Sequence, residues 1–223
     1  SQWLQFAVLL GLLLFYFLNL RAIGYHARQE MWKAIIGSLN LFSVVMVLST
    51  LSTRFFFPLI SLEGRRFWIL GLAPVSRGRL LYSKFLFAFL CNVLLAEGMI
   101  LVSNLMLGSA LSFGVYQFCV ALCAAAALAG LAVGLGAVFP DYAAASPAQA
   151  VSGFGGTLCM ILSLGYSMVV VIASAFAPVS LSRSGPHSVK AVIIGTAIVL
   201  VSTVLATWWP LRAGEAVLRE AEL

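Results

Sequence analysis

Six long apolar runs, separated by short breaks that hold most of the charged residues, dominate this sequence. Each run has close to the 20 or so residues that an α-helix needs to cross a bilayer. Because lipid cannot hydrogen-bond to free backbone groups, every run is expected to be helical. The sequence therefore predicts an all-α membrane protein of one domain, with six transmembrane helices over residues 3–20, 34–53, 85–107, 111–139, 151–177 and 192–209.

Composition supports this class. Only 9% of the 223 residues are charged, whereas a soluble domain usually has about 25%. The net charge of +6 is not a nucleic-acid signal, because the basic residues lie in the breaks between apolar runs, where they meet anionic lipid headgroups. We expect the bilayer as a partner and no nucleic acid.

The break over residues 54–84 is the most basic part of the chain and is expected to be a cytoplasmic insert. It contains six of the thirteen basic residues, namely Arg54, Arg65, Arg66, Arg77, Arg79 and Lys84. Cytoplasmic loops of membrane proteins carry an excess of Lys and Arg. This orientation predicts a multi-pass protein of the cell's inner or plasma membrane with both termini in the cytoplasm. Residues 210–223 alternate apolar and charged residues and are expected to form an amphipathic tail on that surface.

Within the insert, Ser61 is placed to cap a short interfacial helix, with Glu63 in its first turn. Phe67 and Trp68 supply an apolar side, and Arg65 and Arg66 a charged one. Two interpretations remain open at this point. The helix either anchors the chain to headgroups or transmits motion from a soluble motor to the spans.

Two stretches, RFFFPLISLEGRRFWILGLAPVSRGRLLYSKF and GAVFPDYAAASPAQAVSGFGGTLCMILSLGY (136–166), resemble permease subunits of type-2 ATP-binding cassette (ABC) exporters, and LLLFYFLNLR (12–21) looks similar too. The resemblance implies six spans and a coupling helix at 62–71 that docks on an ABC ATPase subunit. The implied docking residues are Glu63, Arg65, Arg66, Phe67, Trp68 and Asp141, although Asp141 also fits a simple turn.

Members of the resembled family are longer than this chain, which starts at Ser1 directly before an apolar run. We therefore expect it to be a C-terminal portion of a longer protein. A second permease copy, or the missing N-terminal half, would complete the transport path. The cargo is left undefined by the resemblance.

No catalytic, cofactor or metal site is predicted in this chain. The phosphate-binding motif G-x-x-x-x-G-K-[ST] is absent, and SGFGGT (152–157) opens a membrane helix rather than following a strand. ATP and Mg²⁺ are therefore expected on a partner ATPase, and the chain itself is not expected to be an enzyme. Cys119 and Cys123 lie one helical turn apart without a nearby His or carboxylate, which favours packing over metal binding.

Glu97 is the only acid inside a predicted span, and Asn92 and Asn104 lie on the same span. A carboxylate at that depth is costly unless it faces protein or water, has a partner or is protonated. These three residues are candidates for a translocation path. The alternative is that Glu97 is neutral and hydrogen-bonded to a neighbouring helix, and that the two amides also join helices.

Small residues predict close helix packing. Gly130 and Gly134 form a G-x-x-x-G pair that fits another span or a second protomer, and Gly153, Gly155 and Gly156 suggest packing or a hinge.

The sequence thus indicates the permease component of an ABC transporter. Two alternatives remain. One is an ion- or proton-coupled secondary transporter that uses Glu97, and the other is a membrane scaffold that recruits partners without transport.

Overall fold

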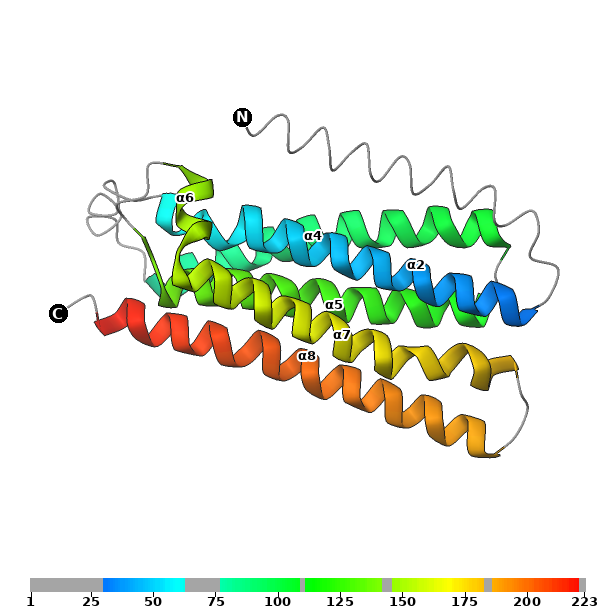
Figure 1. Cartoon of the computed structure of the whole chain (residues 1–223). Helices are drawn as coiled ribbons and strands as arrows, with labels where there is room; N and C mark the ends of the chain where they lie inside the picture. Colours follow the sequence, from blue (N-terminus) through cyan, green and yellow to red (C-terminus); the bar gives the residue numbers. More distant parts are fainter. Residues whose placement is uncertain (1–29, 63–76, 109–110, 142–145, 183–185, 221–223) are drawn as a thin grey trace.

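The computed structural model describes residues 30–62, 77–108, 111–141, 146–182 and 186–220. Within these ranges the chain is helical, with no strand. Five long helices run lengthwise beside one another: α2 (Glu30–Leu51), α4 (Arg77–Leu107), α5 (Leu111–Val138), α7 (Phe154–Ser182) and α8 (Pro186–Glu220) (Figure 1). A π-helix, η1 (Ser52–Phe56), and a 3₁₀ turn, η2 (Phe57–Leu59), extend α2, and the short α6 (Pro147–Ser152) precedes α7.

Five helices of the described chain are long and apolar enough to cross a membrane, over Ile36–Leu59, Gly78–Leu107, Leu111–Val138, Phe154–Ser174 and Val192–Leu218. The all-α prediction is confirmed for the described residues, and these five correspond to the last five predicted spans. The first predicted span, 3–20, lies outside the described residues. Within the described residues the structure therefore shows five helices that match predicted spans, and the sixth prediction is not tested there.

The insert over 54–84 is shorter than predicted. Helical structure continues from α2 through η1 and η2, and α4 already begins at Arg77. Two features explain why helical structure continues past residue 53, where the predicted span ends. The segment Phe55–Ile60 is apolar, and Pro58 occupies a first-turn position of η2, where its missing N–H costs no helical hydrogen bond. Residues 63–76, with the expected coupling helix, lie outside the described residues.

Pro210 does not end the last helix. The prediction stopped the span at Trp209 and began a separate tail, whereas α8 continues through Pro210 to Glu220. The last turns remain packed, because Leu211 and Leu218 are both buried. Tertiary contacts therefore hold the segment helical despite the hydrogen bond that a proline removes.

Helix α5 is the centre of the bundle. In its most apolar window 72% of residues are buried, compared with 28% for α4 and 17% for α8, so these two helices leave most of their apolar surface exposed. The buried part of α5 is rich in Ala and Gly. A Cβ added at Gly130 would lie 2.7 Å from the Thr207 Cα of α8. The two backbones approach each other closely because side chains are missing between them.

The α5–α8 contact generates a test with Gly134→Ala. The new Cβ would lie 2.5 Å from the Pro210 carbonyl carbon, so the helices would have to separate. We expect a loss of about 1–3 kcal/mol in the free energy of unfolding, typical of overpacking, read as a lower melting temperature in detergent. Gly98→Ala is the matched control, since nothing lies within 4 Å of its added Cβ. Equal melting temperatures for both variants would contradict this packing.

Candidate functional site

Chain segments that are far apart in sequence meet at one end of the bundle. This end contains η2, the first turns of α4, the last turns of α5 and α8, and α6 (Figure 1). The basic stretch 63–76 is connected to the same end, because it follows Leu62 and precedes Arg77. We call the described part of this region the polar end.

The first turns of α4 are tied to two neighbours at the polar end. Lys84 Nζ donates a hydrogen bond to the carbonyl oxygen of Leu59 at 3.1 Å, which joins α4 to η2. On α8, Glu215 accepts a hydrogen bond from the Tyr82 hydroxyl at 3.5 Å, and its carboxylate also lies over Gly78. A displacement of the start of α4 would therefore be transmitted to both η2 and α8.

A hydrogen bond at the polar end also joins Ser61, just before residues 63–76, to Asp141, just after α5. The backbone N–H of Asp141 donates to the Ser61 hydroxyl at 3.1 Å, and Ser61 is buried. This bond joins the chain just before residues 63–76 to the chain just after α5. The sequence suggested Ser61 as a helix cap, and the structure shows it as an acceptor for a residue 80 positions away.

Backbones pack closely in the region next to these bonds. The carbonyl oxygen of Phe57 lies against Gly136 of α5, where a Cβ would clash with it. Gly155 of α7 is covered by Phe139, 2.5 Å from an added Cβ. Gly156 lies over the backbone of Val151. Gly153 is the C-cap of α6 and has extended backbone geometry, so the chain bends between α6 and α7 there.

The π-helix η1 directly precedes η2 in the chain. Single π-turns within α-helices occur often at functional sites, and η1 places Ser52 next to α4. Asn92 Nδ2 donates to Ser52 Oγ at 2.9 Å and to the Ala125 carbonyl oxygen at 3.4 Å. Asn92 therefore connects the irregular end of α2 to α4 and α5.

The three path candidates are not joined to one another by hydrogen bonds among the described residues. Asn92 is fully buried, and its Oδ1 has no partner in the described part of the chain. Glu97 is 9% exposed, and neither of its carboxylate oxygens has a hydrogen-bond partner among the residues described. Asn104 lies near the far end of α4, beside Gly114 of α5. Their role in a path stays a prediction.

Two further buried amides were not singled out from the sequence. Gln117 Nε2 donates to the Gly37 carbonyl oxygen at 2.6 Å. Asn40 is 1% exposed, and within the described ranges its carboxamide has no hydrogen-bond partner. Both interrupt apolar runs, so a search for amides in every predicted span, and not only in the span of Glu97, would have found them.

The expected docking residues Glu63, Arg65, Arg66, Phe67 and Trp68 lie outside the described residues. Asp141, the sixth, lies at the polar end, held through its backbone by Ser61. The described residues contain no group of three or more His, Cys, Asp or Glu side chains that could hold a metal ion.

A protein family described as "Putative ATP-binding cassette" matches residues 1–223. The chain belongs to this family. No curated protein and no solved structure gives a match. Membership places the chain in an ABC transporter context, and its five long apolar helices are compatible with membrane insertion.

The family match corrects the more specific assignment. The prediction of a type-2 exporter permease was wrong, because the matching family is described as an ATP-binding cassette and not as a permease. The features behind that prediction, apolar spans and a basic loop, occur in many multi-pass membrane proteins and do not separate one class from another. The match does not favour either alternative, the coupled secondary transporter or the scaffold.

The Asn92–Ser52 bond can be tested with a double-mutant cycle. Asn92→Ala removes the donor and Ser52→Ala removes the acceptor of the 2.9 Å bond. We expect a coupling free energy of about 0.6 kcal/mol, the usual size for a hydrogen bond between membrane helices. Unfolding of the two single variants and the double variant in mixed micelles measures it. Strictly additive losses would show that the bond does not stabilise the junction between η1 and α4.

Proposed function

We propose that this chain is a membrane-inserted member of an ATP-binding cassette (ABC) transporter system, and that ATP is bound by a partner subunit. One coincidence carries the proposal: the family match covers residues 1–223, and the described part of these residues holds five helices suited to crossing a membrane. The family description names ATP binding, yet the 223 residues contain no phosphate-loop motif. A nucleotide site outside these residues reconciles the two observations.

The polar end is the proposed contact surface for that subunit. The support for this surface is the set of hydrogen bonds that connect it to the rest of the bundle. Residues 63–76 are flanked by Ser61, which is bonded to Asp141, and by the start of α4, which is bonded to η2 and α8. A partner that moved this stretch would pull on four elements at once. The proposed contacts are those expected from the sequence: Glu63, Arg65, Arg66, Phe67, Trp68 and Asp141.

The orientation follows from the same proposal. ATP is a cytoplasmic nucleotide, so a partner that uses it would meet the polar end on the cytoplasmic face of the inner or plasma membrane. The basic residues of 63–76 support this side. A second copy of the chain, or the N-terminal half of a longer protein, would complete the assembly. With the predicted span 3–20 added to the five described ones, both termini would lie in the cytoplasm.

The proposal predicts where nucleotide binds. The purified chain in lipid nanodiscs should bind no labelled ATP, whereas the complex isolated through its tag from native membranes should contain a nucleotide-binding subunit with ATPase activity. Arg66→Glu should weaken that complex about tenfold, equal to roughly 1.4 kcal/mol. Lys190→Glu, an exposed position on the first turns of α8, is the control of equal charge change. ATP bound by the isolated chain, or an undiminished Arg66→Glu complex, would count against the proposal.

Topology is tested separately by labelling. In a variant whose four native cysteines are replaced by alanine, Leu62→Cys lies at the polar end and Lys190→Cys on the first turns of α8, both at exposed positions. A membrane-impermeant maleimide added to intact cells should label Lys190→Cys and spare Leu62→Cys until the membrane is opened. The reverse pattern would place the polar end outside the cell and remove it from contact with an ATPase.

A further inference from the structure

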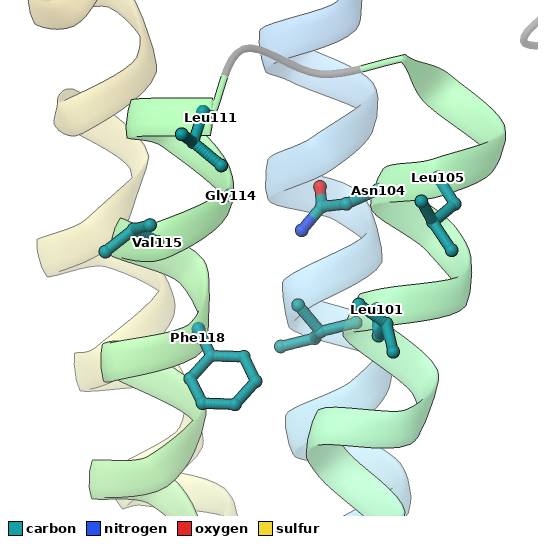
Figure 2. A pocket seen from close by; sticks show the side chains of 8 residues that line it. Leu101, Asn104, Leu105, Leu111, Gly114, Val115 and Phe118 are labelled. Atoms are coloured by element: carbon teal, nitrogen blue, oxygen red, sulfur yellow. The ribbon is translucent and has the colours of Figure 1, made fainter.

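A groove lies between α4 and α5 at the end of the bundle opposite the polar end. Its volume is about 320 Å³, within the range of small-molecule sites. Leu101 and Leu105 of α4 form one wall, and Val115 and Phe118 of α5 form the other (Figure 2). The fully buried Ile100 also lines it. Gly114 widens it by having no side chain.

Among the described residues that line this groove, Asn104 is the one with a polar side chain. Its carboxamide points from α4 toward α5 (Figure 2). A Cβ added at Gly114 would lie 3.5 Å from Asn104 Nδ2. The carboxamide has no hydrogen bond to another residue in the described part of the chain, unlike Asn92 on the same helix, which has two. An amide in apolar surroundings without a partner is unfavourable, so a molecule that brings an acceptor would be bound preferentially.

The depth of the groove matches one chemical class of occupant. Asn104 lies three residues before the end of α4 at Leu107, or about 4.5 Å along the helix axis, close to where a span leaves the hydrocarbon. From Gly114, which lies level with Asn104, to Phe118 the wall of α5 extends about 6 Å in the other direction (Figure 2). An occupant that fits has a hydrogen-bond acceptor near the membrane interface and an apolar chain that runs toward the bilayer centre. A fatty-acyl ester has both.

We propose that this groove binds one acyl chain of a glycerolipid, whose ester carbonyl accepts a hydrogen bond from Asn104 Nδ2. The walls are strongly exposed, with Leu105 at 75% and Leu111 at 84% of their surface, so in a bilayer lipid reaches them without any rearrangement. A helix of a second copy fits less well. Its backbone carbonyls are already bonded within the helix, and close helix contacts favour small residues rather than this rim of Leu, Val and Phe.

The test titrates delipidated, detergent-purified protein with phospholipid and counts bound lipids by native mass spectrometry. Two lipids are compared, a diester and its diether analogue, which lacks the carbonyl acceptors. Wild type should bind the diester about fivefold more tightly, the usual worth of one hydrogen bond. Asn104→Leu should bind both lipids equally. Gly114→Leu, which fills the groove, should weaken both by at least about tenfold.

Gly165→Leu is the matched control, because nothing lies within 4 Å of a Cβ added there on α7. It should bind lipid as the wild type does. Melting temperatures of all variants establish that they are folded. If Gly114→Leu is folded and keeps the wild-type lipid, or if wild type does not distinguish ester from ether, the proposal is overturned. A dimer that forms without lipid and is lost in Gly114→Leu would assign the groove to a second copy and would also overturn it.

Discussion

Close approach of α5 to its neighbours is the packing constraint on which the rest of this bundle depends. In lipid the hydrophobic effect does not drive helices together, so van der Waals contact must do so, and contact is closest where side chains are absent. Gly130, Gly134 and Gly136 leave room for α8 and for the Phe57 carbonyl of η2. With α5 buried in this way, α4 and α8 can expose most of their apolar surface to the bilayer.

The same packing explains why the polar end forms one mechanical unit. The last turns of α5 hold η2 through Gly136 and α8 through Gly134, and side-chain bonds from Lys84 and Tyr82 add the start of α4. The π-helix η1 is the irregular element in this region, and Asn92 stabilises it from α4. A region that links several helices to an irregular turn gives a partner a place to act on the whole bundle, which is the basis of the proposed contact surface. The lipid groove is at the other end and does not depend on that proposal.

The limits of sequence reasoning are clearest at element ends. Residues 54–59 were placed in the insert and outside the second span, because the apolar run ends before Arg54, yet they are helical. Long basic side chains can remain on a helix at the membrane boundary and extend toward water or a carbonyl, as Lys84 does. Pro210 was taken as a helix end for its missing N–H, but burial of Leu211 and Leu218 maintains the helix. The permease assignment failed for a related reason, since span count and loop charge do not separate one class of membrane protein from another.

Run length and apolar composition by themselves determined the helical membrane class and the location of five described spans, because backbone groups in lipid must be bonded within their own segment. Those are local requirements, and a single sequence states them directly. The partners of each helix were decided only in three dimensions. The bond from Asp141 to Ser61 and the contact of Gly134 with Pro210 join residues distant in sequence, and the groove between Asn104 and Gly114 depends on how two consecutive helices pack. The order in which helices pack is set by the fit of whole surfaces, which no single apolar run contains.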